Sequence, residues 1–247
     1  MNISRLDDLP VELFHNIFHH LSAYEIFYAF TNVTPYIDSL LNTYGYYRLK
    51  FKTIRRNHFD LVCQRIIPDQ VIALTLSDDN DTPGLIDLFL SRFQLDQFTR
   101  LQALKLMEIR LDCSENIISQ MTPLKHLRSF IYYPVNRADP CIPKMTADRI
   151  VQLDRSLFDM YSPILPQLCQ LRLDRGDLFS SIQFPRLRYL TLGRSSYDVL
   201  KHISSAASQL HTLQTRLSIK PLPAELFPPM PDLTRLILET RGKYSCD

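Results

Sequence analysis

One short apolar pattern recurs along most of this chain and limits the folds it can adopt. An apolar residue is followed by two others, a second apolar residue, one other and a third apolar residue, as in Leu101, Leu104 and Leu106. The instances start at Val71, Leu101, Leu127, Leu168, Leu187, Leu210 and Leu233, at spacings of 30, 26, 41, 19, 23 and 23 residues. Repeats of this length predict similar units that stack side by side.

The alternation within each unit explains why the units should stack. A short strand with alternating apolar residues buries one face and exposes the other. Because one such strand is unstable alone, neighbours stack in parallel around a continuous core. The sequence therefore predicts an α/β solenoid over residues 70–247, with a parallel sheet on its concave side. Helical apolar spacing places three of the returning segments at residues 84–93, 114–121 and 197–210.

These units resemble degenerate leucine-rich repeats. They are degenerate because the asparagine that normally follows the strand is replaced, for example by Ile109, Gly176 and Ser195. The longest spacing contains a proline-rich stretch at 134–143, which is either a tolerated insertion, the favoured interpretation, or a recognition loop. A helix capped by Thr146 should follow it, with a buried stripe of Ile150, Leu153, Leu157, Phe158 and Tyr161.

The last repeat is followed by few residues. Solenoids usually end in a polar capping repeat, and none is visible after Leu238. Either the segment RGKYSCD caps the array irregularly, or the sequence is a piece of a longer protein.

The first helix of the chain carries two apolar stripes. Pro10 suits a first helical position, and the negative charge of Glu12 interacts favourably with the positive end of the helix dipole. One stripe holds Leu13, Ile17 and Leu21, and the other holds Phe14 and Phe18. Since a small core needs only one stripe, we expect one to face the interior and the other a partner protein.

Two more short helices complete an N-terminal module over residues 1–49. Ser22 and Glu25 form a capping box for the second helix, and Thr34 with Pro35 starts the third. The basic run at 48–58 then opens a connector over residues 50–69, whose Leu49, Phe51, Ile54 and Phe59 should pack on the first repeat. The run could instead touch nucleic acid or serve as a nuclear address, but a net charge of +2 favours the connector.

The segment LPVELFHNIFHHLSAYEIFYAF resembles the F-box in the order and spacing of its LP, E, IF, LS and EI elements. The resemblance implies docking on the Skp-type adaptor of a cullin ubiquitin ligase. The docking residues it implies are Leu9, Pro10, Ile17, Phe18, Leu21 and Ile26. The chain departs from the family in its third helix, because it contains no tryptophan.

Composition and motifs argue against other functions. The near-neutral charge and the lack of a long apolar run argue against nucleic-acid and membrane binding. Five scattered cysteines without a C-x-x-C pair fit a reducing cytoplasmic or nuclear setting. His15 and His19 have zinc-ligand spacing, but with Glu12 they are too few, and an exposed polar helix face explains them. No motif indicates an enzyme, a metal site or a cofactor.

The alternation of the strands also predicts which side chains meet a target. Residues between the buried apolar positions point to the concave face. They are Lys105, Met107, Ile131, Tyr133, Arg172, Asp174, Tyr189, Thr191, Gln214, Arg235, Ile237 and Glu239. The hypothesis is a substrate-recognition subunit of a Skp-cullin-F-box ubiquitin ligase whose repeat face binds an unknown target protein. The alternative is an interaction scaffold without ligase coupling.

Overall fold

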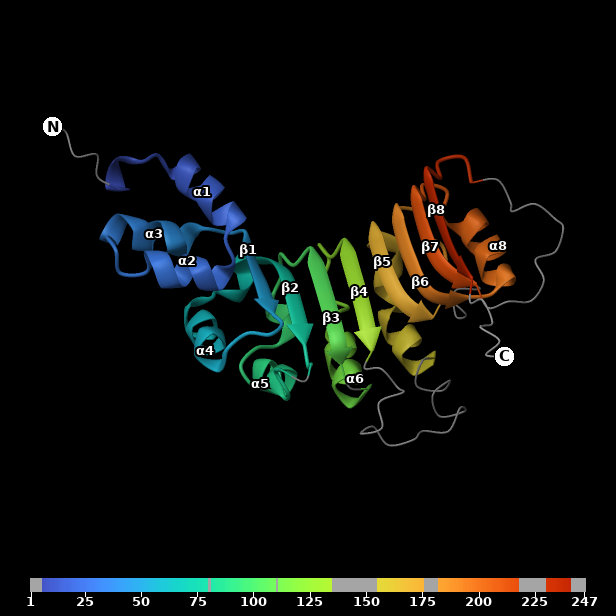
Figure 1. The fold of residues 1–247 in the computed structure, drawn as a ribbon, viewed down its shortest axis with the longest axis horizontal. Coiled ribbons are helices and arrows are strands. Elements are labelled where there is room, and N and C mark those ends of the chain that lie inside the picture. Colours follow the sequence, from blue (N-terminus) through green and yellow to red (C-terminus); the bar gives the residue numbers. More distant parts are fainter. Residues whose placement is uncertain are drawn as a thin grey trace, which may run out of the picture.

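The computed structural model describes residues 6–79, 81–109, 111–134, 155–175, 182–217 and 230–240. Within these ranges, eight strands form one open, all-parallel sheet in chain order (Figure 1). The strands are β1 (Tyr47–Phe51), β2 (Val71–Ser77), β3 (Ala103–Ile109), β4 (Ser129–Pro134), β5 (Gln170–Arg175), β6 (Tyr189–Ser195), β7 (Thr212–Leu217) and β8 (Arg235–Thr240). The predicted α/β class with a parallel sheet is therefore confirmed.

Three α-helices precede β1, and helical segments also separate most of the strands that follow it. The α-helices are α1 (Val11–His20), α2 (Ala23–Phe30), α3 (Pro35–Thr43), α4 (Arg56–Arg65), α5 (Leu85–Leu90), α6 (Leu111–Ser119) and α8 (Tyr197–Ala206). The described ranges also contain the short 3-10 helices η1 (Leu6–Asp8), η2 (Pro68–Gln70), η3 (Leu95–Gln97) and η4 (Ser162–Gln167). Residues 155–161 are also helical.

The sequence repeat and the strand register coincide. The second apolar residue of each unit pairs with its counterpart on the next strand, in the series Leu74, Leu104, Phe130, Leu171, Leu190, Leu213 and Leu236. From Leu74 to Leu213 these side chains are at most 1% exposed, whereas Leu236 on β8 is 44% exposed. The apolar series thus forms one continuous core that becomes accessible at the last strand.

The helices cover one face of this sheet. Phe51 of β1 meets Phe59 of α4 and Phe89 of α5, with ring centroids 4.8 and 5.8 Å apart. Further along, the Ser114 hydroxyl of α6 lies 3.0 Å from the Tyr132 hydroxyl of β4. Phe51 and Tyr132 are both buried on the face of the sheet that the helices cover, so the residues that alternate with them lie on the opposite face.

The three predicted return helices are present; two are shorter than their patterns, and α6 starts three residues earlier and ends two residues earlier than its pattern. Residues 84–93, 114–121 and 197–210 correspond to α5, α6 and α8. Gly84 has a left-handed φ of 72° and precedes α5, while Ala207 leaves the helical region and ends α8. In the helical stretch at 155–161, Leu157, Phe158 and Tyr161 are buried as predicted. The loop at 134–143 beyond Pro134, the cap Thr146, Ile150, Leu153 and the terminal RGKYSCD lie outside the described residues.

The connector predicted over residues 50–69 contains regular structure. Its start belongs to strand β1, whose residues Tyr47, Leu49 and Phe51 are buried in alternation with exposed Arg48 and Lys50. The helix α4 follows. The predicted boundary at residue 49 therefore falls inside the first strand, because Leu49 and Phe51 pair with Leu74 and Leu76 of β2.

The N-terminal helices follow the caps that the sequence predicts. Ser22 and Glu25 exchange both hydrogen bonds of a capping box, and the Thr34 hydroxyl accepts from the Ile37 N–H at 3.2 Å. Pro10 stands just before α1 rather than at its first position, a difference within the usual uncertainty of helix ends. The second helix, α2, packs against the sheet, since Phe27 stacks on Tyr47 of β1 at 5.0 Å.

Candidate functional site

The two apolar stripes of α1 face different surroundings. Phe14 and Phe18 are 0% and 1% exposed, whereas Leu13 and Ile17 are 46% and 38% exposed. The separation follows from helix geometry, because consecutive residues lie about 100° apart around the axis. We call Leu13 and Ile17 the outer ridge. It is an apolar surface that the chain itself leaves accessible.

Four of the six predicted docking residues are at least partly accessible. Ile17 and Pro10 are exposed, and Leu9 and Leu21 are half-buried. Phe18 and Ile26 are each 1% exposed and belong to the interior of the helices, so their docking role stays a prediction. The Phe18 ring lies 5.2 Å from that of Phe30 and 5.3 Å from that of Tyr44, between the helices.

Other accessible residues were not assigned to docking by the sequence. Leu13 belongs to the outer ridge, and Leu6, Val33 and Tyr36 are 42%, 46% and 36% exposed. The Tyr36 hydroxyl donates to the carbonyl oxygen of Leu9 at 3.3 Å, which joins the start of α3 to the segment before α1. The spacing of Leu13 four residues before Ile17 had placed both on one stripe, but the docking residues that the family resemblance implies did not include Leu13.

His15 is less exposed than its assignment to a polar outer face implies. Its ring is half-buried and lies 5.3 Å from that of Tyr44, and its Nε2 has no hydrogen-bond partner in the described part of the chain. His19 and His20 are exposed. No group of three His, Cys, Asp or Glu side chains in the described ranges is placed to hold a metal ion.

The second candidate surface is the sheet face that alternates with the core. One row of paired residues crosses it, consisting of Lys50, Thr75, Lys105, Ile131, Arg172, Thr191, Gln214 and Ile237. The next row includes Met107 paired with Tyr133, and Arg216 paired with Glu239. The predicted target-binding residues all lie on this face and are exposed or half-buried.

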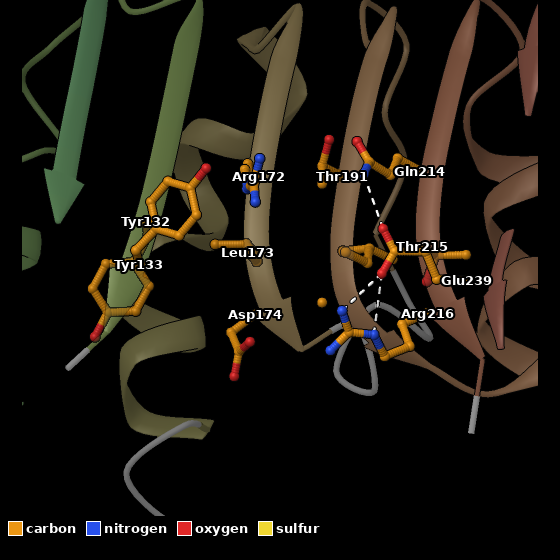
Figure 2. A pocket seen from close by; sticks show the side chains of 12 residues that line it. Tyr132, Tyr133, Arg172, Leu173, Asp174, Thr191, Gln214, Thr215, Arg216 and Glu239 are labelled. Carbon is orange, nitrogen blue, oxygen red and sulfur yellow. Dashed lines mark hydrogen bonds and ion pairs between the residues drawn. The ribbon is translucent and has the colours of Figure 1, made fainter. Parts of the chain in front are cut away.

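Several of these residues line one pocket of about 210 Å³ at the strands β4 to β8 (Figure 2). Tyr133, Arg172, Asp174, Thr191, Gln214 and Glu239 were predicted to be on this face. Lys105, Met107, Ile131, Tyr189, Arg235 and Ile237 do not line the pocket. Tyr189 is 50% exposed and pairs with Gln170 and Thr212 at the amino ends of the strands, away from Arg216.

Two pocket residues of the open face, Gly193 and Arg216, were not predicted from the sequence. Arg216 follows Gln214 by two positions and so belongs to the same face. The third apolar position of this repeat is a threonine, Thr215, so the alternation could not be followed as far as Arg216 in the sequence. Gly193 follows Thr191 in the same way. Both the backbone and the side chain of Asp174 lie where a Cβ of residue 193 would be, so this position of the pocket has no room for a side chain.

Charge in the pocket is arranged in two different ways. The Glu239 carboxylate accepts from Arg216 at 2.7 and 3.2 Å and from Gln214 at 3.4 Å. The Arg216 hydrogen bonds hold the pKa of Glu239 below its ordinary value. The guanidinium of Arg172 instead lies over the Tyr133 ring, with its Cζ 4.3 Å from the centroid. Such a set of polar and charged groups can bind and orient a ligand.

Replacing Gly193 by alanine is expected to destabilise the sheet at the pocket. A Cβ at this position would lie 2.5 Å from the backbone oxygen of Asp174, so β5 and β6 would have to move apart. We expect a loss of about 1–3 kcal/mol in the free energy of unfolding, measured by urea denaturation. Thr191→Ala, on the same strand and face, is the control. Equal stability of Gly193→Ala and wild type would contradict the close approach of the two strands.

No protein-family model matches the chain, and no curated protein sequence is detectably similar to it. None of the helices in the described ranges has the length and apolar character needed to cross a membrane.

Proposed function

We propose that this chain is the substrate-recognition subunit of a Skp-cullin-F-box ubiquitin ligase. In this proposal the N-terminal helices are an F-box-like module, and the sheet with its helices is a degenerate leucine-rich-repeat solenoid. The supporting observation is the outer ridge. Leu13 and Ile17 stay accessible while Phe14 and Phe18 already form the module's interior. An apolar ridge that the module does not need for its own core is available for an adaptor.

The proposed mechanism is proximity and involves no bond chemistry by this chain. The adaptor and a cullin bring the transferring enzyme, and the open sheet face holds the target, which raises the local concentration of the target. The strands stand in the sheet in chain order, and α1 precedes β1. The pocket at β4 to β8 therefore lies toward the other end of the sheet from α1 (Figure 1), so both partners can bind at once. This role belongs in the cytoplasm or the nucleus.

The outer ridge alone is a modest source of affinity. Full burial of a Leu or Ile side chain contributes about 1.5–3 kcal/mol. Because less than half of Leu13 and Ile17 remains exposed, docking can gain only about 1 kcal/mol from each. Adaptor binding therefore needs further contacts, and Leu6, Pro10 and Tyr36 are accessible for them.

Co-expression of the full chain with a Skp-type adaptor tests the proposal. We expect a complex that survives size-exclusion chromatography and that binds a cullin only when the adaptor is present. Separate elution of the chain and a correctly folded adaptor would contradict ligase coupling.

One observation favours the alternative, an interaction scaffold without ligase coupling. The helix α2 packs on β1, where Phe27 and Tyr47 stack, so the N-terminal helices also cover the first end of the sheet. A scaffold would keep these helices as a cap and would not bind the adaptor. The same co-expression experiment separates the two functions.

A further inference from the structure

Two cations of the open face converge on one aromatic ring. The Lys105 Nζ lies 5.9 Å and the Arg172 Cζ lies 4.3 Å from the ring centroid of Tyr133. Lys105 on β3 and Arg172 on β5 are both paired with Ile131, and Tyr133 lies two positions after Ile131 on the same strand. The ring therefore has a cation diagonally on each side, and its π face holds the arginine in place.

The hydrogen-bonding capacity of Arg172 is not used within the described part of the chain. A guanidinium has five N–H donors, and no described residue accepts a hydrogen bond from those of Arg172. The pocket's other arginine differs, because two of the Arg216 donors bind Glu239. Arg172 is half-buried, so part of its hydration is already lost while its donors remain available.

The surrounding charges favour one anionic group next to Arg172. Lys105 adds a second positive charge on the Tyr133 side, while Asp174 lies on the same strand two residues after Arg172. Glu239 is paired with Arg216 at 2.7 Å, and Arg172 also helps to lower its pKa, so these arginines compensate the charge of the carboxylate. Thr191 and Gln214, in the same row as Arg172, supply further polar groups to the pocket.

We propose that the target binds through an anionic side chain, a carboxylate or a phosphorylated hydroxyl, that accepts hydrogen bonds from Arg172 in the pocket between β4 and β8. An arginine offers two parallel N–H donors, the geometry that suits both oxyanions. Tyr133 is a positioning residue that fixes the guanidinium before the ligand arrives. The inference rests on the proposed function in that the ligand is taken to be a segment of a target protein.

Selection of random linear peptides displayed on phage, with the full chain immobilised, tests the proposal. Wild type should enrich peptides that contain Asp or Glu. Arg172→Glu should lose this enrichment and favour Lys and Arg instead. The matched control is Arg188→Glu, which makes the same change at an exposed position just before β6, outside the pocket. Unbiased peptides from wild type, or the same acidic enrichment from Arg172→Glu, would overturn the proposal.

Two further measurements sharpen the result. In synthetic copies of an enriched peptide, the acidic residue is replaced by phosphoserine. Tighter binding of the phosphoserine peptide identifies a phosphorylated hydroxyl as the preferred group, and weaker binding identifies a carboxylate. In either case, Arg172→Glu is expected to lose binding of both peptides. Tyr133→Leu should weaken binding roughly threefold to thirtyfold, and Tyr133→Phe should restore it. Equal losses in both Tyr133 variants would contradict the positioning role of the ring.

The selection uses no adaptor, so its outcome is independent of ligase coupling. Failure to bind the adaptor with retained acidic selection would reject only the ligase function. Adaptor binding without acidic selection would reject only the inference about the pocket.

Discussion

Replacing Ile17 by aspartate is expected to abolish adaptor binding while the chain stays folded. The loss of apolar contact area explains little of this effect. Ile17→Ala, which removes most of that area, should weaken binding only about fivefold. Aspartate instead buries an unpaired charge in an apolar interface, which costs about 3–5 kcal/mol or at least 100-fold in affinity. Titration of the purified chain with adaptor by isothermal calorimetry measures both variants.

The control for this prediction adds the same charge beside the ridge. Asn16 is exposed on α1 and lies about 100° around the helix from Ile17. Asn16→Asp should bind the adaptor within a few-fold of wild type. If Ile17→Asp binds as tightly as wild type, the outer ridge does not contact the adaptor.

Replacing Phe18 by alanine is expected to produce the largest loss of stability in the N-terminal module. The side chain is 1% exposed and its ring contacts those of Phe14, Phe30 and Tyr44 at 5.2–6.0 Å between centroids. Truncation of a buried phenylalanine typically costs about 3–5 kcal/mol. Hydrogen exchange should show faster opening of α1, α2 and α3, with less change in the strands β5 to β8.

Leu13→Ala is the matched control for Phe18→Ala. It removes an apolar side chain from the same helix, but 46% of that side chain is exposed, so the loss of stability should be much smaller. If Phe18→Ala instead keeps the hydrogen-exchange protection of wild type and loses only adaptor binding, then Phe18 is a docking residue as the sequence resemblance implied.

Local features of this protein were predictable from its sequence. The capping box at Ser22 and Glu25 and the Thr34 cap depend on neighbours three residues away. The strand positions follow a period of two that any half-buried strand must show, so the apolar repeat predicted the parallel register of β2 to β8. The first strand obeys the same rule through Tyr47, Leu49 and Phe51, but its basic residues favoured the interpretation as a connector.

The assignment of residues to the partner surfaces needed tertiary structure. Ile17 and Phe18 are adjacent and both apolar, and only the packing of α1 against Phe30 and Tyr44 decides which of them remains accessible. In the same way, the pocket draws residues from β4 to β8, across more than a hundred positions of chain, and includes Gly193, where Asp174 of the neighbouring strand leaves no room for a Cβ. The sequence by itself determined the periodicity and the helix caps, which depend on near neighbours, and the parallel sheet, because the same apolar pattern recurs in successive units. The tertiary structure decided which apolar ridge faces outward and which charges meet, because burial and pairing depend on residues that the sequence separates.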